Sequence, residues 1–499
     1  MLQPLDEHNQ RLLANAHPPD WRNPEPRERY HLVVVGGGTA GLVSAAAAAS
    51  LGAKVALVER NLLGGDCLTV GCVPSKAVIR ATRAWHDARS AEPVFGGPAV
   101  AGEGNFAVVM ERMRRIRADL SPLDGAPRFS RLGVDVFLGE GRFVGPDVVE
   151  VEDTRLNFRR AVIATGSRPA TPPIPGLEAA GFLTNETVFS LTDLPPRLLV
   201  IGAGPIGCEL TQAFARLGSK VTIFDRNQHP LPREDADAAA LLRRVMERDG
   251  IAFRPGAEIA RIDRQGGDKR VGLAGASGEE WLRGDEILVA AGRVPNVEGL
   301  GLERAGVEYD AVGVRVNDRL QTTNPRVYAA GDICTRYKFT HAADAMARIV
   351  VQNALFFGRA RVSRLVIPWT TYTSPEVAHV GMYEEDASEA GHVDTITVPL
   401  REVDRARLDG EDDGFFRVHL RKGTDRILGA TLVAEHAGEM ISEITLAMTA
   451  GLGLSKIGGT IHPYPTQAEV FRKAADAWRR RKLTPRVKRL FESYFRVFR

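Results

Sequence analysis

Two cysteines five residues apart, Cys67 and Cys72, hold half of the four thiols in the 499-residue chain. In a regular α-helix this spacing turns the second side chain about 140° away from the first, so the sulfurs could pair only through irregular backbone. Gly71 supplies the necessary backbone freedom. Pro74 suits the first turn of a helix over residues 74–90, whose positive N-terminal end favours a thiolate over a thiol. The segment therefore predicts a redox-active thiol pair.

Two other uses of these cysteines agree less well with the sequence. A zinc site needs further Cys or His ligands at close spacing, but Cys208 and Cys334 stand alone and no Cys-x-x-Cys pair occurs. A structural disulfide is disfavoured because no secretory signal opens the chain, and in the cytoplasm disulfides are mostly catalytic or sensing. We therefore expect a cytoplasmic protein without a metal site.

The residues before the thiols are typical of a dinucleotide-binding unit. An apolar strand at 31–35 leads into a glycine motif, an Ala-rich helix and a second strand at 54–58 that ends at Glu59. The glycines allow a tight turn and the close approach of a pyrophosphate to a helix N-terminus, and Glu59 can bind a ribose hydroxyl. The glycines of the motif are Gly36, Gly38 and Gly41.

The same order of elements recurs later in the chain. A strand at 198–201 precedes a second glycine motif, a helix to Leu217 and a strand at 220–224 that ends at Asp225. An internal duplication of the dinucleotide-binding unit is the simplest explanation, and two units imply two nucleotides. A dithiol beside two nucleotides indicates an electron relay. The glycines of the second motif are Gly202, Gly204 and Gly207, and matching strand-to-turn segments end at Thr165-Gly166 and at Gly292.

Residues 361–475 follow a different pattern. Strand-like segments at 368–381 and 415–434 precede helices at 438–450 and 466–480, which predicts a separate α+β domain. A Pro-rich turn before the last helix carries three titratable side chains, His462, Tyr464 and Glu469. Glu469 is a candidate to orient the turn, and a solvated acid favoured by the helix dipole is the alternative.

Asp332 follows a strand at 327–330 and precedes a helix from about residue 341. An acidic side chain at a strand end can bind cofactor hydroxyls, and a helix cap is the alternative.

Together, the motifs at 36–41, 67–76, 202–209, 292–296, 331–332 and 462–469 resemble the FAD-dependent pyridine nucleotide disulfide oxidoreductases over roughly residues 31–475. The resemblance implies an α/β fold with two Rossmann-like dinucleotide-binding domains and a C-terminal α+β dimerisation domain. It also implies FAD as the first nucleotide, NADH or NADPH as the second, and a homodimer that completes the active site across subunits. The expected segments are an N-terminal extension (1–30), an FAD-binding domain (31–190, with 296–360 returning to it), an NAD(P)-binding domain (191–295), a dimerisation domain (361–475) and a basic tail (476–499).

The resemblance also assigns roles to single residues. Cys67 is implied to be the interchange thiol that meets substrate, Cys72 to face the flavin, and Lys76 to pair with Glu209 near the flavin ring. The implied FAD contacts are Gly36, Gly38, Gly41, Glu59, Gly65, Lys76, Thr165, Gly166 and Asp332. The implied nicotinamide-nucleotide contacts are Gly202, Gly204, Gly207, Asp225, Arg226 and Gly292. Asp225 would bind a ribose hydroxyl and repel a phosphate, which favours NADH, but Arg226 could receive the phosphate of NADPH.

Within the family, the sequence is most similar to mercuric reductases. Tyr464 stands where dihydrolipoamide dehydrogenases and glutathione reductases carry a catalytic histidine, and a phenol with a pKa of ~10 is a poor acid or base for a thiol pair at neutral pH. We therefore expect electrons to pass from NAD(P)H through FAD and the thiols to a soft metal ion, such as mercuric or cupric. The alternatives are a reductase of a small disulfide or a quinone, with His462 as proton donor, and a non-catalytic redox-sensing module associated with membranes.

The chain is 44% hydrophobic and 25% charged, which is typical of globular proteins. Its basic residues gather at the C-terminus, where residues 472–499 carry eleven Lys and Arg against two acids. Such a tail has the pattern of a basic amphipathic helix at an anionic membrane, but packing on the dimer or on the N-terminal extension is favoured, because most amphipathic helices pack on their own protein. No nucleic-acid partner is expected. The apolar stripe comprises Val487, Leu490, Phe491, Tyr494, Phe495 and Phe498, with Arg486, Lys488, Arg489, Glu492, Arg496 and Arg499 mostly off it.

Overall fold

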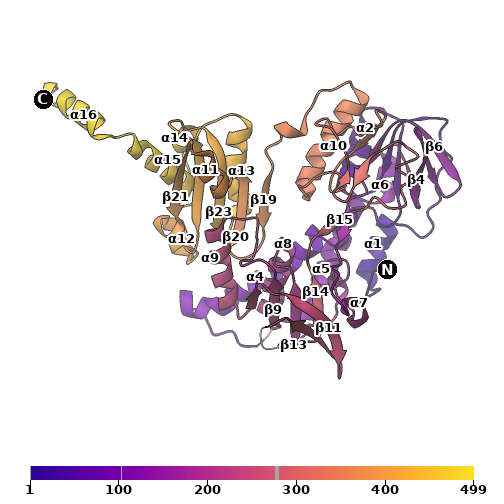
Figure 1. Ribbon diagram of the computed structural model, residues 1–499, viewed down its shortest axis with the longest axis horizontal. Coiled ribbons are helices and arrows are strands. Elements are labelled where there is room, and N and C mark those ends of the chain that lie inside the picture. Colours follow the sequence, from indigo (N-terminus) through magenta and orange to yellow (C-terminus); the bar gives the residue numbers. More distant parts are fainter. Residues whose placement is uncertain (1, 103, 276–279, 499) are drawn as a thin grey trace. The chain divides into compact units, whose positions relative to one another are not determined.

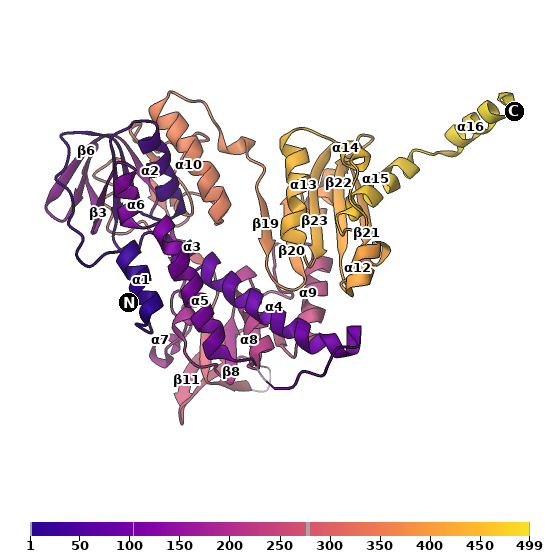
Figure 2. The same cartoon turned by 180° about the vertical axis from the view of Figure 1, so that it is seen from behind.

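The computed structural model describes residues 2–102, 104–275 and 280–498. Its internal contacts divide the chain into two compact units, each built from several segments. The first unit comprises residues 1–89, 100–226 and 250–365, and the second comprises 90–99, 227–249 and 366–499. Figures 1 and 2 show the elements of each unit from opposite sides.

A seven-stranded sheet in the first unit has the order β3-β2-β1-β6-β5-β4, with β18 also paired to β6. β1, β2, β3, β6 and β18 run parallel, while β4 and β5 form an antiparallel extension. The strands are β1 (Tyr30–Val35), β2 (Val55–Glu59), β3 (Val134–Leu138), β4 (Gly141–Gly145), β5 (Val148–Val151), β6 (Thr154–Ile163) and β18 (Val327–Ala329).

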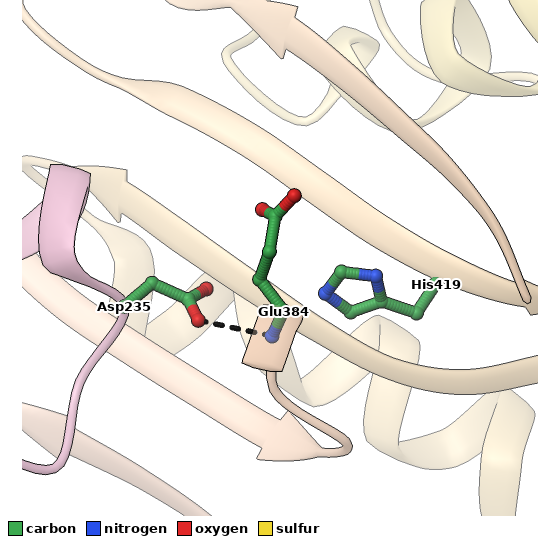
Figure 3. Close-up of side chains that lie close together, drawn as sticks. All are labelled: Asp235, Glu384 and His419. Atoms are coloured by element: carbon green, nitrogen blue, oxygen red, sulfur yellow. Dashed lines mark hydrogen bonds between the residues drawn. The ribbon is translucent and has the colours of Figure 1, made fainter. Parts of the chain in front are cut away.

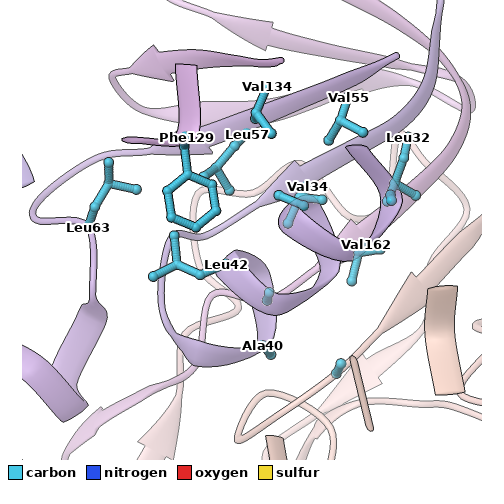
Figure 4. Packing of buried hydrophobic residues seen from close by; sticks show 14 of the residues in the cluster. Leu32, Val34, Ala40, Leu42, Val55, Leu57, Leu63, Phe129, Val134 and Val162 are labelled. Atoms are coloured by element: carbon cyan, nitrogen blue, oxygen red, sulfur yellow. The ribbon is translucent and has the colours of Figure 1, made fainter. Parts of the chain in front are cut away.

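Both faces of this sheet are buried, which explains why β1 is a continuous apolar run. Successive side chains of a strand point to opposite faces, and accordingly Leu32 and Val34 lie in one hydrophobic cluster while Val33 and Val35 lie in another. The first cluster includes side chains of α2 (Thr39–Ser50) and α10 (Thr340–Leu355), and Figure 4 shows part of it. The sheet and these helices position the first glycine motif.

A second parallel sheet in the first unit has the order β10-β9-β8-β14. The units β1-α2-β2 and β8-α8-β9 repeat the same order, and in both the acid that ends the second strand accepts a backbone N–H of the glycine motif. Gly37 donates to Glu59 at 2.6 Å, and Ala203 donates to Asp225 at 2.6 Å. The predicted duplication is therefore present. The elements are β8 (Arg197–Ile201), α8 (Pro205–Leu217), β9 (Lys220–Asp225), β10 (Ala252–Pro255) and β14 (Glu286–Val289).

Smaller elements complete the first unit. β11 (Ile259–Gln265), β12 (Asp268–Leu273) and β13 (Glu280–Gly284) form an antiparallel sheet, and β7 (Ser167–Pro169) pairs with β15 (Arg293–Pro295). The helices not yet named are α1 (Glu7–Ala16), α3 (Gly65–Thr69), α4 (Cys72–Phe95), α5 (Phe106–Leu120), α6 (Ala126–Arg131) and α7 (Leu177–Ala180). The residues of α4 from Ser90 onward are counted with the second unit.

The second unit is an α+β fold around a five-stranded antiparallel sheet with the order β19-β20-β23-β22-β21. α13 and α15 contribute buried side chains to the core of this sheet, among them Ile441 and Phe471. The strands are β19 (Pro368–Thr371), β20 (Glu376–Gly381), β21 (Val393–Pro399), β22 (Phe415–Arg421) and β23 (Ile427–Ala434). The helices are α9 (Ala236–Arg248), α11 (Glu384–Ala390), α12 (Asp404–Asp409), α13 (Ala437–Thr449), α14 (Leu454–Gly459), α15 (Glu469–Arg481) and α16 (Pro485–Val497).

Several details differ from the expectations. The helix predicted over residues 74–90 extends over residues 72–95, and the extension at 1–30 contains α1, whose Leu12 is fully buried. The stripe predicted in the tail lies on α16 and its C-cap, Phe498. None of the residues of α16 is buried, and Arg499 lies outside the described residues. No helix among the described residues combines the length and the apolar character needed to cross a membrane. The domain limits remain a prediction.

Candidate functional site

The two cysteines lie on consecutive helices that are separated by a short break. Cys67 is in the middle of α3, and Cys72 is the first residue of α4. Gly71 lies in the break, and a Cβ built on it would come 2.7 Å from the backbone oxygen of Asp66. A side chain there would force α3 and α4 apart. The irregular backbone that the spacing requires is therefore present, and it is the close approach of the chain that demands glycine.

The environment of Cys72 favours the thiolate. The Cys67 thiol donates a hydrogen bond to Cys72, and this bond is the main cause that lowers the pKa of Cys72. The hydroxyl of Thr340, the first residue of α10, lies 3.3 Å from the Cys72 sulfur, and the positive charge of Lys76 acts in the same direction. The same hydrogen bond raises the pKa of Cys67, with a further contribution from burial. Within this pair Cys72 is therefore the thiolate and Cys67 the thiol.

Lys76 lies one turn after Cys72 on α4 and forms an ion pair with Glu209 of α8. The Lys76 Nζ is 2.7 Å from Glu209 Oε2, and the Glu209 side chain is 6% exposed while that of Lys76 is 37% exposed. Helical spacing places Cys72 and Lys76 on the same face of α4. This geometry agrees with the pairing that the family resemblance implies, although the catalytic role of the pair stays a prediction.

The first glycine motif forms a cradle that a dinucleotide pyrophosphate can enter. Gly38 is the N-cap of α2, and no side chain caps this helix, so its N-terminal N–H groups are left for a ligand. A Cβ on Gly65 would come 2.6 Å from the Cα of Gly38, and Gly65 has a φ of 56°. Two glycines therefore face each other where α2 and α3 begin. These residues fit the pyrophosphate of FAD.

The other predicted FAD contacts lie around the ends of β6 and β18. Gly36 packs so tightly that a Cβ would come 2.3 Å from the Ala164 oxygen. Next to it, Thr165 donates to the backbone oxygen of Asn296 at 2.9 Å, and the Asn296 amide donates to the Thr165 oxygen at 2.8 Å. Gly166 has a φ of 67°, which favours glycine.

Asp332 accepts a hydrogen bond of 2.7 Å from the Ser167 hydroxyl. The helix-cap alternative for Asp332 is wrong, because α10 begins eight residues later and its N-cap is Phe339. The sequence alone did not indicate a role for Arg293. Its guanidinium donates to the Ser167 hydroxyl and to Asp66, and its Nε lies 3.7 Å from Asp332. Arg293 therefore ties the start of the redox helix α3 to the Asp332 turn.

The second glycine motif has open space where a ligand can approach. A Cβ on Gly204 would meet no atom within 4 Å, and no side chain caps α8. Gly202 and Gly207, in contrast, are packed against backbone oxygens, and a Cβ on Gly207 would come 1.9 Å from the Gly202 oxygen. Asp225 is half-buried and Arg226 is exposed. The motif therefore fits the pyrophosphate of a second dinucleotide. Gly292 also has open space beside it, because a Cβ built there would meet no atom within 4 Å.

In the second unit, each of the three predicted side chains of the Pro-rich turn has its own partner. The Nε2 of His462 lies 3.1 Å from Glu443 Oε1 on α13. Tyr464 is 71% exposed and donates to Asp404 at 3.1 Å, and this hydrogen bond raises the pKa of the phenol above its ordinary value.

Glu469 is the first residue of α15, is 6% exposed and pairs with Arg472 at 2.5 Å. The alternative of a solvated acid at this position is therefore wrong.

One group of three side chains in the described residues could in principle hold a metal ion, namely Asp235, Glu384 and His419 (Figure 3). Arg417 already provides the cation in this place, because its Nη1 lies 2.6 Å from Glu384 and 3.4 Å from Asp235. His419 is uncharged at neutral pH, since burial lowers its pKa. We therefore assign this group to the internal ion pairing of the second unit.

Comparisons with known proteins identify the family of the chain. The model of the pyridine nucleotide-disulphide oxidoreductases matches residues 30–347, and the model of the dimerisation domain of the same proteins matches residues 367–475. The mercuric reductase of Lysinibacillus sphaericus is 35% identical over 459 residues, which cover 91% of this chain and 84% of the relative. The dihydrolipoyl dehydrogenase of Thermus scotoductus is 36% identical over 459 residues, which cover 90% and 97%.

Among solved structures, a Cu(II) complex of the HOCl-induced flavoprotein disulfide reductase RclA from Escherichia coli is similar, with a TM-score of 0.80 and 28% identity over 89% of this chain and 98% of that one. The fold, the duplicated glycine motifs, the thiol pair and these matches lead to one conclusion. The chain belongs to the pyridine nucleotide-disulphide oxidoreductases, a family of FAD-binding enzymes that use NAD(P)H.

Proposed function

We propose that this flavin-dependent disulfide oxidoreductase transfers electrons from NAD(P)H to a soft metal ion, such as Hg²⁺ or Cu²⁺, through the Cys67–Cys72 pair. When bound, FAD supplies hydride acceptance from the nicotinamide and electron transfer to the thiols. Oxidation of the dithiol to the disulfide releases two protons and two electrons, which are enough to reduce one Hg²⁺ to Hg⁰ or two Cu²⁺ to two Cu⁺. Thiolate ligands suit these soft ions.

The observation that carries the choice of acceptor is the environment of Tyr464. An enzyme that exchanges electrons with an organic dithiol needs an acid and base near neutral pH at this turn. The phenol of Tyr464 is already unsuited to that task, and the hydrogen bond to Asp404 moves its pKa further from neutral. A metal ion bound by thiolates requires no proton transfer to the acceptor, so Tyr464 does not impede it. The mercuric reductase similarity points the same way.

A second candidate function, the reduction of a small disulfide or a quinone, is favoured by one observation. His462 and Glu443 form a pair at 3.1 Å, and the His462 side chain is 7% exposed. A carboxylate that orients an imidazole is an arrangement found in general acid and base catalysis. The similarity to dihydrolipoyl dehydrogenase agrees with this candidate.

A substrate panel distinguishes the candidates. We expect the FAD-loaded enzyme to oxidise NAD(P)H faster with Hg²⁺ or Cu²⁺ than with lipoamide, oxidised glutathione or a quinone. Tyr464→His should raise turnover with lipoamide, and Tyr464→Phe should leave it unchanged. Higher wild-type turnover with a disulfide, together with its loss in His462→Gln, would establish the second candidate instead. No NAD(P)H oxidation with any acceptor would support a redox-sensing module without catalysis.

The choice of nicotinamide follows from the end of β9. We propose NADH as the preferred donor, because the Asp225 carboxylate, held by the Ala203 N–H, would repel a ribose phosphate. The exposed Arg226 is the only feature of this turn that argues for NADPH. Asp225→Ser should lower the ratio of kcat/KM for NADH over NADPH, and an unchanged ratio would exclude this role for Asp225.

We also propose that the C-terminal tail binds an anionic membrane surface. α16 leaves Leu490, Tyr494 and Phe495 more than half exposed, and basic residues flank this apolar stripe. A helix with one apolar and one basic face binds at the boundary of lipid headgroups and acyl chains. Each basic residue near such a surface contributes up to ~1 kcal/mol, which salt reduces.

Sedimentation with liposomes tests the tail. We expect the full chain to pellet with vesicles that contain phosphatidylserine, less so at high salt, and a chain that ends at Arg481 to stay in solution. Phe491→Ser with Phe495→Ser should weaken binding while keeping every charge. Equal pelleting of the full and truncated chains would refute the proposal, and a change of oligomeric state on truncation would indicate packing in the dimer.

A further inference from the structure

The N-terminal segment contacts the redox segment on both sides of Cys67. Before the cysteine, the backbone oxygen of Ala16, the last residue of α1, accepts the N–H of Leu63 at 3.1 Å. After the cysteine, a side chain of α5 connects α1 to the end of α3. The Arg117 Nη1 donates to the Thr69 oxygen at 2.5 Å, and its Nη2 donates to the Asn9 side-chain oxygen at 2.6 Å.

Arg117 is unusual because it is buried and, among the described residues, forms no hydrogen bond or ion pair with a carboxylate. Its side chain is 1% exposed, and the two acceptors with which it bonds, the Asn9 amide and the Thr69 backbone, are both neutral. The carboxylate of Asp6, the N-cap of α1, is bonded to Arg114 at 2.5 Å. Burying a guanidinium among neutral acceptors is costly. We attribute this cost to the position that Arg117 must hold. One of its bonds fixes the last residue of α3, Thr69, and the other joins Arg117 to Asn9 of α1.

Asn9 is the residue that makes this contact specific. It is fully buried, and its amide nitrogen donates to the Pro4 oxygen at 2.7 Å, which orients the side-chain oxygen toward Arg117. Its backbone N–H donates to the Asp6 carboxylate, the N-cap of α1. α1 is itself anchored, because Leu12 and Ala16 lie in the same hydrophobic cluster as Leu63 and Leu68. The packing of α1 therefore holds Asn9 in a fixed position next to Arg117.

We propose that α1 is a positioning element of the redox site, and that Asn9 and Arg117 are positioning residues that hold α3 so that Cys67 stays next to Cys72. α3 has only five residues, which is too short for a helix to be stable by itself. Its ends are therefore held from outside, by Arg117 at Thr69 and by Arg293 at Asp66. Neither Asn9 nor Arg117 touches substrate or cofactor in this account.

The position of α3 should affect the equilibrium between the dithiol and the disulfide of Cys67 and Cys72. Two thiols that are held side by side form a disulfide more readily than two thiols that move independently, because their effective concentration is higher. When α3 is released, the equilibrium dithiol + oxidised dithiothreitol ⇌ disulfide + reduced dithiothreitol should shift toward the protein dithiol. A net hydrogen-bond contribution of about 1 to 1.4 kcal/mol corresponds to a decrease in this equilibrium constant of roughly five- to tenfold.

The test measures this constant in the FAD-loaded full chain. Wild type, Asn9→Leu, Asn9→Asp and Arg11→Gln are equilibrated without oxygen in mixtures of reduced and oxidised dithiothreitol, alkylated and analysed by mass spectrometry of the Cys67 and Cys72 peptide. We expect the equilibrium constant of Asn9→Leu to be lower than that of wild type by roughly five- to tenfold, because this substitution removes the acceptor of the Arg117 Nη2. Asn9→Asp loses the bond to the Pro4 oxygen but keeps an acceptor oxygen for the Arg117 Nη2, and its equilibrium constant should stay closer to that of wild type than the constant of Asn9→Leu.

Arg11→Gln is the matched control. Arg11 joins α1 to Asp119 of α5 at 2.5 Å, but the pair lies at the surface and does not reach α3. A wild-type constant in Asn9→Leu, even with a lower thermal midpoint, would show that the contact is merely structural and would overturn the proposal. An equal decrease in Arg11→Gln would overturn it as well. If Asn9→Leu does not fold, Asn9→Ser, whose hydroxyl is too short to reach Arg117, carries the same expectations. No metal ion enters this assay, so its result is independent of the acceptor proposed above.

Discussion

Removal of one hydroxyl next to the active thiolate provides a sharp test of the electrostatics of the site. Thr340 begins α10, and its Oγ1 lies 3.3 Å from the Cys72 sulfur, where it helps to lower the pKa of Cys72. Thr340→Val keeps the β-branched shape and removes the hydrogen bond. The pKa of Cys72 should therefore rise toward its ordinary value.

The size of the rise follows from the strength of the lost bond. A hydrogen bond to a charged group contributes about 1.5–3 kcal/mol, and a bond to the weaker acceptor sulfur is expected to contribute less, roughly 0.7–1.4 kcal/mol. At 1.36 kcal/mol per unit, the pKa should rise by about half a unit to one unit. The thiolate exists above the pKa and is lost as the pH falls through it. Below the midpoint, the variant should therefore contain about three- to tenfold less thiolate than wild type.

The assay is the rate of alkylation of Cys72 by iodoacetamide, measured over a series of pH values on the reduced, FAD-loaded enzyme. Fragmentation of the alkylated peptide separates Cys72 from Cys67. Thr340→Ser keeps the hydroxyl and should keep the wild-type midpoint. An unchanged midpoint in Thr340→Val, or an equal shift in Thr340→Ser, would refute the assignment of this hydroxyl.

Three further changes test other parts of the account. Lys76→Met should slow the reduction of bound FAD by NAD(P)H in stopped flow without loss of FAD, because it removes the positive charge that is paired with the nearly buried Glu209; reduction at the wild-type rate would remove Lys76 from the mechanism. Gly65→Ala should yield protein with little bound FAD, since its Cβ would lie 2.6 Å from Gly38, and full flavin content would contradict the cradle. Burial raises the pKa of Glu234 to about 7, so the folded protein holds a proton that the unfolded chain releases at lower pH. Stability should therefore fall as the pH rises toward 7, and Glu234→Gln should show a flatter profile in thermal melts.

Much of the fold could be predicted because the relevant signals are local. The apolar runs of β1 and β8, the glycine motifs and the acids that end β2 and β9 follow one another within about thirty residues, and each has a direct physical meaning. The irregular backbone at Gly71 could likewise be predicted from the spacing of the cysteines. The pairing of Lys76 with Glu209 joins residues 133 positions apart, and the family resemblance alone implied it.

Other parts of the site depend on contacts that no local pattern reveals. Thr340 lies 268 residues from Cys72, and Asn9 lies 108 residues from Arg117. A buried arginine also has no sequence signature, because in an amphipathic charged helix such as α5 most arginines are exposed. Arg293 does have a sequence signal. It directly follows Gly292 in a motif that repeats a cofactor-binding turn, and this position could have indicated its place in the site.

The central claim is that Cys67 and Cys72 form the redox centre, with Cys72 as the thiolate at the flavin. Its most direct test is an anaerobic NAD(P)H titration of the FAD-loaded enzyme and of its two single-thiol variants. The measured quantity is the long-wavelength absorbance that a thiolate donating electron density to flavin produces. The account predicts this band in wild type and in Cys67→Ser and its absence in Cys72→Ser. A band in both variants, or one that survives in Cys72→Ser and disappears in Cys67→Ser, would contradict it.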